Sequence, residues 1–170
     1  TEGFGKRLLD LQNEDYHWGV AYYHPKWTST HYTLLELRRL ELKTNPNIMN
    51  AIHYILDNIK TDDGGITPNP HVWKFSDVCI NGMSLFFMCY WGVNQEKLIS
   101  VVDYIIKQQL HDGGFNCNYN YKKYGAKHSS LHSTLSMIEG FNSYITNGYT
   151  YRLEEIKKMR ADSIEFILKV

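Results

Sequence analysis

Apolar residues recur with helical spacing in three stretches of the chain, at 48–59, 98–106 and 153–167. Within each stretch they fall three or four positions apart, which places them along one face of an α-helix. The pattern therefore predicts three amphipathic helices, each with a single buried stripe.

A second kind of helical segment precedes each amphipathic helix, at about 28–43, 76–92 and 129–146. Residues that favour turns or helix starts separate the two members of each pair: Asn45-Pro46, Gly92 and Asn147-Gly148. We therefore expect helix pairs, and no segment of the sequence indicates a β-sheet.

The tetrapeptide Asp-Gly-Gly-apolar follows the first two pairs, at 63–66 and again 49 residues later at 112–115. Two glycines after a helix are typical of a C-terminal cap and turn. A period of about 50 residues lies in the range of helical repeat arrays. The sequence predicts an all-α fold of repeated helical hairpins, with three repeats near 28–66, 76–115 and 129–170 in a single domain, 1–170.

The two ends of the sequence suggest that the repeats continue. The chain begins at Thr1 without a methionine, and it stops at Val170 inside an amphipathic pattern, where a further Asp-Gly-Gly loop would be due. We expect the domain to be part of a larger array.

Charge and composition limit the classes of partner. The chain has 18 basic and 18 acidic side chains, so no net positive charge favours nucleic acid or an anionic membrane. No apolar run approaches the roughly 20 residues that span a bilayer. The hydrophobic content of 43% is enough for one core.

The three cysteines, Cys79, Cys89 and Cys117, are too few and odd in number for a secreted disulfide scaffold. We therefore predict a reduced, cytoplasmic protein. Its thiols are then free for packing, metal binding or reactivity.

One group of residues is typical of a metal site. Asp77 and Cys79 begin the second helix pair, and His132 begins the third. Equivalent helix ends in a repeat array face the same side, so we expect the three side chains to converge there. A carboxylate, a thiolate and an imidazole together favour zinc, with the fourth position open to bind a substrate thiol as thiolate.

The order of these residues and the helix-pair spacing of the Gly-Gly loops resemble the sequences of squalene cyclases and of protein prenyltransferase β subunits. Proteins of these families fold as an α/α toroid. The motifs are closest to those of the prenyltransferases. The resemblance implies that Asp77, Cys79 and His132 bind zinc, and that the protein transfers an isoprenoid group to a thiol acceptor. It also implies an apolar isoprenoid-like ligand and either a partner subunit or self-association.

The same resemblance assigns substrate contacts to the segment before Asp77. Lys74 would contact the isoprenoid diphosphate with help from His71, which stands where the family has arginine, and Trp73 would line an apolar cavity. The chain departs from the family pattern at Ile80, Met83 and Leu131, which replace aromatic residues. The Asp-x-Asp-Asp motif of the cyclases does not occur in the chain.

Each of these residues also has a structural interpretation. Asp77 and His132 can cap their helices, Cys79 can simply pack in the core, and Lys74 can be a solvated surface residue. The segment 128–132 pairs serines with histidines, which is also compatible with a serine nucleophile beside a base. The alternative function is a non-catalytic helical-repeat module that binds a peptide or a protein.

Overall fold

The computed structural model describes residues 2–117 and 125–169 and is all-helical over these residues, which confirms the all-α part of the predicted fold. The only β pairing among them is an isolated bridge between Lys60 and Ile66. The structure contains the helices α1 (Gly3–Asp10), α2 (Thr30–Arg39), α3 (Pro46–Asn58), α4 (Val78–Tyr90), α5 (Gln95–Ile106), α6 (Leu131–Thr146) and α7 (Leu153–Lys169).

Side-chain caps set several of the helix starts. Asn45 accepts a hydrogen bond from the backbone N–H of Ile48, and Pro46 occupies the first turn of α3, as the sequence predicts. Asp77 and Ser130 cap α4 and α6 in the same way. Because the capping residue lies outside the helix, α4 and α6 each begin two residues later than the helical pattern suggests.

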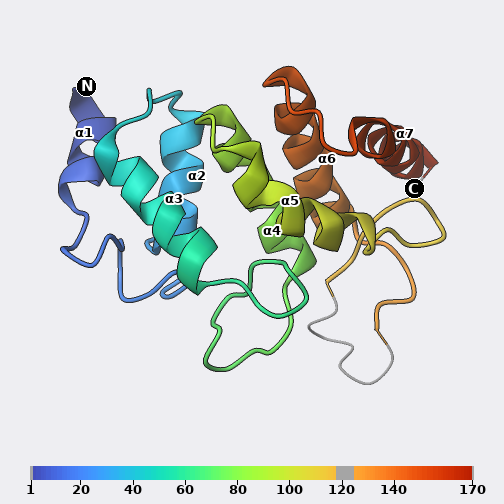
Figure 1. The fold of residues 1–170 in the computed structure, drawn as a ribbon, viewed down its shortest axis with the longest axis horizontal. Helices are drawn as coiled ribbons and strands as arrows, with labels where there is room; N and C mark the ends of the chain where they lie inside the picture. Colours follow the sequence, from blue (N-terminus) through green and yellow to red (C-terminus); the bar gives the residue numbers. More distant parts are fainter. Residues whose placement is uncertain (1, 118–124, 170) are drawn as a thin grey trace.

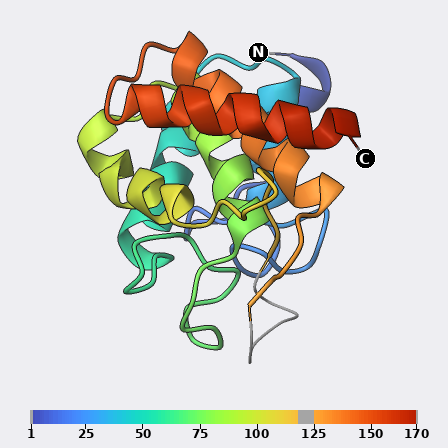
Figure 2. The ribbon, with the colours of Figure 1, turned by 90° about the vertical axis from the view of Figure 1, so that its right-hand side faces the viewer.

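The helices are arranged in a stack in which α4 contacts both α2 and α6 (Figure 1). In the same view α3 lies in front of α2, and α5 in front of α4. Helix α7 packs across α6 and also contacts α5 (Figure 2). Helix α4 therefore lies between α2 and α6 and contacts both.

Two glycines allow α4 and α6 to approach closely. A Cβ atom on Gly140 would lie 2.5 Å from the carbonyl oxygen of Gly82, and one on Gly82 would lie 2.8 Å from that of Ser136. The hydroxyl of Ser143 also donates a hydrogen bond of 2.8 Å to the carbonyl of Phe86 on α4. This contact fixes the position of the α4 start relative to the α6 start.

The two Asp-Gly-Gly loops are built alike. Asp63 accepts hydrogen bonds from the backbone N–H of Ser76 at 2.9 Å and from its hydroxyl at 2.6 Å. Asp112 accepts the equivalent pair from Ser129, with 2.9 Å for the backbone bond. Each aspartate thus ties its loop to the residue just before the capping residue of the next inner helix.

Each loop also lies next to the start of an inner helix, because the backbone N–H of Asp77 donates to the carbonyl of Ile66 and that of Ser130 donates to the carbonyl of Phe115. The first glycine of each loop has a positive φ, 91° at Gly64 and 90° at Gly113, which is a conformation that glycine adopts without steric cost. The repeated loop therefore leads the chain from each of the first two helix pairs to the start of the next inner helix.

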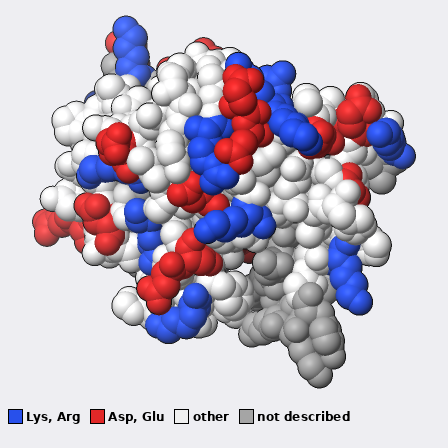
Figure 3. All heavy atoms as spheres, turned by 45° about the vertical axis from the view of Figure 1, so that its right-hand side comes forward, with Lys and Arg blue, Asp and Glu red and all other residues white. Residues whose placement is uncertain are grey.

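The surface carries both signs of charge. Figure 3 shows basic and acidic side chains intermixed on the face it presents, and several form ion pairs within α7, such as Lys158 with Asp162 at 2.6 Å. None of the helices in the described part of the chain is both long and apolar enough to cross a bilayer.

Candidate metal centre

The candidate site lies where α4 begins. Asp77 is the N-cap of α4, and one of its carboxylate oxygens accepts a long hydrogen bond of 3.4 Å from the backbone N–H of Ile80. The backbone N–H of Asp77 donates to the carbonyl of Ile66 at 3.2 Å, which holds the cap against the first Asp-Gly-Gly loop. Asp77 as a whole residue is only 9% exposed.

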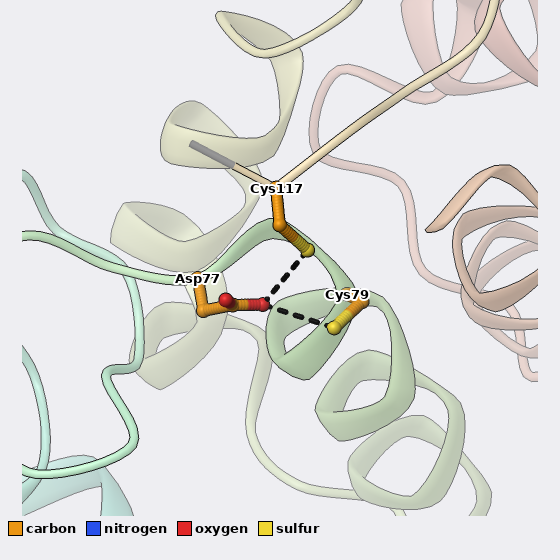
Figure 4. Close-up of side chains that lie close together, drawn as sticks. All are labelled: Asp77, Cys79 and Cys117. Carbon is orange, nitrogen blue, oxygen red and sulfur yellow. Dashed lines mark hydrogen bonds between the residues drawn. The ribbon is translucent and has the colours of Figure 1, made fainter. Parts of the chain in front are cut away.

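Cys79 lies on the first turn of α4, two residues after the cap. Its thiol donates to Asp77 Oδ1 at 2.9 Å (Figure 4). A capping carboxylate leans over the first turn of its helix, so an Asp-x-Cys sequence at a helix start brings the two side chains together. The sequence-based pairing of Asp77 with Cys79 is therefore observed as a direct contact.

A second cysteine reaches the same carboxylate from the other Asp-Gly-Gly loop. Cys117 follows Phe115 by two residues, and Phe115 is fully buried with its backbone N–H bonded to the Thr134 hydroxyl at 3.0 Å. This anchor directs the chain towards α4, and the Cys117 thiol lies 3.1 Å from Asp77 Oδ1 (Figure 4). Its sulfur also lies 3.4 Å from the hydroxyl of Ser133 on α6.

Asp77, Cys79 and Cys117 are thus three potential metal ligands whose oxygen and sulfur atoms all lie within 4.8 Å of one another. Within residues 2–117 and 125–169 they form the one such group of histidine, cysteine or acidic side chains. The start of α4 supplies Asp77 and Cys79. The second Asp-Gly-Gly loop leads into Cys117, which follows Cys79 by 38 positions in the chain.

The two thiols affect each other's protonation. Their mutual contact, followed by burial, raises the pKa of Cys79 far above its ordinary value, whereas the same contact lowers the pKa of Cys117. The contact between the two groups thus favours removal of a proton from Cys117 and opposes removal of one from Cys79.

The donor set fits zinc. Bond lengths of about 2.3 Å to sulfur and about 2.1 Å to oxygen place the ligands of a tetrahedral zinc ion about 3.6 Å apart. The observed oxygen–sulfur distances are 2.9 and 3.1 Å, so these ligand atoms must move apart by about 0.5–0.7 Å to hold such an ion. Magnesium and calcium prefer oxygen ligands alone and fit less well.

A cavity of about 470 Å³ opens directly beside these three residues. Its walls combine the candidate ligands with aromatic, aliphatic and basic side chains: Tyr23, His24, Lys26, Pro68, Trp73, Asp77, Cys79, Ile80 and Cys117. This volume is within the usual range for small-molecule sites. A second cavity, of about 490 Å³, lies beneath α7 and has no cysteine in its walls. The three candidate ligands therefore border the first cavity and not this one.

The other residues singled out in the sequence have different positions. His132 is exposed on the first turn of α6 and is not in the three-residue group. His71 and Lys74 are exposed, and the Lys74 ammonium lies 3.5 Å from the carbonyl of Pro70. Trp73 is partly buried and lines the cavity.

The serines of segment 128–132 have structural roles. The Ser129 hydroxyl donates to Asp112, and Ser130 caps α6 by accepting from the backbone N–H of Ser133. His128 is exposed. The observed hydrogen bonds thus explain both serines without a nucleophilic role.

Cys117 and Lys26 belong to the site although the sequence patterns do not place them there. For Cys117 the sequence indicates only that the loop lies on the same side as the helix starts, and it does not specify the direction in which the loop leaves Phe115. Lys26 belongs to the irregular segment between α1 and α2, where hydrophobic spacing gives no prediction.

Comparisons of the chain with known protein families, with characterised proteins and with solved structures find no match. The geometry of the site therefore carries the functional argument.

Proposed function

We propose that this protein is a zinc-dependent transferase built on an α/α-hairpin array, which transfers an isoprenoid group to a thiol acceptor. The observation that carries the proposal is the convergence of Asp77, Cys79 and Cys117 at the wall of a cavity. In this proposal Cys117 takes the place that the family resemblance gives to His132.

The three side chains leave one position of a tetrahedral ion open. Zinc bound with an open position supplies Lewis-acid chemistry that favours the deprotonated form of a thiol at neutral pH. The protein positions this chemistry through Asp77, whose place as helix cap fixes the carboxylate, and through the buried Phe115 that anchors the Cys117 loop.

The cavity walls suit a ligand with an apolar chain and an anionic head. Trp73, Pro68 and Ile80 provide apolar surface in the same cavity as the three candidate metal ligands. Lys26 also lines the cavity, and its positive charge can pair with a diphosphate. In this assignment Lys26 takes the diphosphate contact that the family resemblance gives to Lys74.

A transfer assay tests the proposal. The zinc-loaded protein is incubated with an allylic isoprenoid diphosphate and a cysteine-containing peptide, and the thioether product is detected by mass spectrometry. We expect product with the wild type, a loss of at least tenfold in rate for Cys117→Ser and for Lys26→Ala, and little change for Lys74→Ala. Zinc binding without any product across a panel of donors and acceptors would contradict the transferase function.

Cobalt substitution tests the metal site separately. Cobalt(II) bound by thiolates gives an intense charge-transfer absorption that grows with the number of sulfur ligands. At saturating cobalt we expect the absorption per bound cobalt ion to fall to about half in Cys79→Ser and in Cys117→Ser, and to stay unchanged in His132→Ala. An unchanged spectrum in Cys117→Ser would exclude Cys117 as a ligand. If the protein binds no metal at all, the helical-repeat module that binds a peptide or protein becomes the better function.

A further inference from the structure

The two cysteines of the site are placed to react with each other as well as to bind a metal. We propose that Cys79 and Cys117 form a reversible disulfide when the metal-free protein meets a hydroperoxide, and that this disulfide prevents metal binding. The disulfide itself follows from the positions of the thiols, and only its effect on metal binding rests on the proposed function.

The sulfur atoms are close enough for this bond. Both thiols donate to the same oxygen of Asp77, at 2.9 and 3.1 Å, and the two sulfurs lie within 4.8 Å of each other. A disulfide has a sulfur–sulfur distance of about 2.05 Å, so the sulfurs must approach by less than about 2.8 Å. Rotation of the two side chains about their Cα–Cβ bonds moves the sulfurs over distances of this size.

Access separates these two cysteines from the third. Cys79 and Cys117 are partly buried and line the 470 Å³ cavity, so a small hydroperoxide can reach them. Cys89 is fully buried in the last turn of α4, and burial raises its pKa well above the ordinary value. Cys89 therefore provides an internal control thiol in the same protein.

The reaction balances with a hydroperoxide as the oxidant. The thiolate of one cysteine attacks the terminal oxygen, the O–O bond breaks, and a sulfenic acid and an alcohol (or water) form. The thiolate of the other cysteine attacks the sulfenic sulfur, the S–O bond breaks, and hydroxide leaves and takes up a proton to become water. The two thiols together lose two electrons, and the peroxide gains them. An added thiol reductant restores both cysteines by thiol–disulfide exchange.

The disulfide and the metal compete for the same atoms. Metal ligation requires the sulfurs as thiolates, and a disulfide sulfur carries no negative charge. Oxidation thus removes two of the three ligands at once. It also links the start of α4 covalently to the second Asp-Gly-Gly loop.

Thiol counting on the full chain tests the disulfide. The reduced, metal-free protein is treated with hydrogen peroxide, quenched, denatured and titrated for free thiols. We expect the count to fall from three to one, with a monomer mass lower by the mass of two hydrogen atoms and a cross-linked peptide that contains Cys79 and Cys117. The Cys89→Ser variant should fall from two thiols to none, whereas Cys117→Ser should keep both of its thiols.

Several outcomes would overturn the disulfide. They are a count that stays at three, addition of oxygen to the thiols without loss of hydrogen, or a cross-link that includes Cys89. Zinc-loaded protein tests the competition, and we expect its two thiols to be lost at least tenfold more slowly. An equal rate with and without bound zinc would contradict the competition. Zinc that fails to bind the reduced protein while the disulfide still forms would contradict the proposed function alone.

Discussion

Asp77 caps α4 and also contacts both cysteines of the site, and these two roles respond differently to substitution. Asparagine is as good an N-cap as aspartate but a poor zinc ligand, whereas alanine provides neither function. We therefore expect Asp77→Asn to lower zinc affinity at least tenfold with little change in stability. Asp77→Ala should lower zinc affinity similarly and also cost about 1 kcal/mol of unfolding free energy.

Zinc titration against a chromophoric chelator, together with urea unfolding of the metal-free variants, measures the two effects. Equal zinc affinity in Asp77→Asn and the wild type would show that the carboxylate acts only as a cap.

His31 makes folding sensitive to acid. Its ring is fully buried on α2, where Nδ1 lies 2.8 Å from the Tyr22 hydroxyl and Nε2 has no partner. Burial lowers the pKa of His31 to about 3. In the unfolded chain the pKa is about 6.5, so the unfolded state binds the proton first as the pH falls. Stability is then fully present above pH 6.5 and is lost progressively towards pH 3.

We expect the unfolding free energy to fall by about 2 kcal/mol between pH 7.5 and pH 5 through His31 alone. Urea unfolding at the two pH values measures this difference in unfolding free energy. In His31→Asn we expect most of the difference to be absent. His17, whose pKa burial also lowers, should contribute the remaining dependence. The same pH dependence in His31→Asn as in the wild type would show that other groups cause it.

Cys117 shows what sequence patterns miss at the scale of a residue. The pairing of Asp77 with Cys79 follows from two positions on one helical turn, which the sequence specifies locally. The approach of Cys117 depends on how deeply Phe115 is buried and on the direction in which the loop leaves it. Such a direction is a property of tertiary packing, so spacing along the chain cannot provide it.

The contact between α4 and α6 depends on the absence of side chains at Gly82 and Gly140. A methyl group on Gly140 would come within 2.5 Å of the Gly82 carbonyl oxygen, which is backbone and cannot move aside easily. We expect Gly140→Ala to lower the unfolding free energy by about 1–3 kcal/mol despite the better helix propensity of alanine. The substitution should also weaken zinc binding, since α6 supports the loop that carries Cys117.

Glu139→Ala is the matched control, because Glu139 is an exposed neighbour on the same helix. We expect it to change the unfolding free energy by no more than about 0.5 kcal/mol. Thermal and urea unfolding of both variants give the comparison, and equal stability of the two would show that α4 and α6 can separate without cost.

The helices themselves were largely predictable. The apolar stripe from 48 to 59, the Asn45-Pro46 start and the paired glycines of the loops are local signals, and the structure has a helix or turn at each of them. The close approach of Gly82 and Gly140 was not predictable, because glycine inside a helix is equally compatible with a weak helix.

At the scale of the whole molecule, the candidate metal site connects two repeats. Asp77 and Cys79 belong to the second helix pair, and Cys117 belongs to the loop that closes it and leads into the third. An ion bound there links elements that are otherwise held by side-chain packing. A ligand that binds only the folded state stabilises it by mass action.

We therefore expect zinc at about 100 times its dissociation constant to raise the unfolding free energy by about 2.7 kcal/mol. Urea unfolding with and without zinc measures this change. The gain should disappear in Cys117→Ser and persist in Cys89→Ser. A gain of the same size in Cys117→Ser would place the stabilising metal elsewhere.

The repeat architecture explains why distant residues meet at this site. Each Asp-Gly-Gly loop leads the chain to the start of the next inner helix, and Asp63 and Asp112 tie the loops to equivalent serines before α4 and α6. Repetition in the sequence predicts that these ends share a side, but which side chains touch there depends on the detailed packing. His132 stands at the position of α6 that corresponds to Cys79 on α4, yet it is exposed rather than turned towards Asp77.

The most direct test of the site is the zinc content of the purified protein, measured by elemental mass spectrometry after preparation under reducing conditions without chelators. We expect close to one zinc per chain in the wild type, in Cys89→Ser and in His132→Ala, and near-complete loss of zinc in Cys79→Ser and in Cys117→Ser. Zinc retained in Cys117→Ser but lost in His132→Ala would contradict the assignment of Asp77, Cys79 and Cys117 as the ligands.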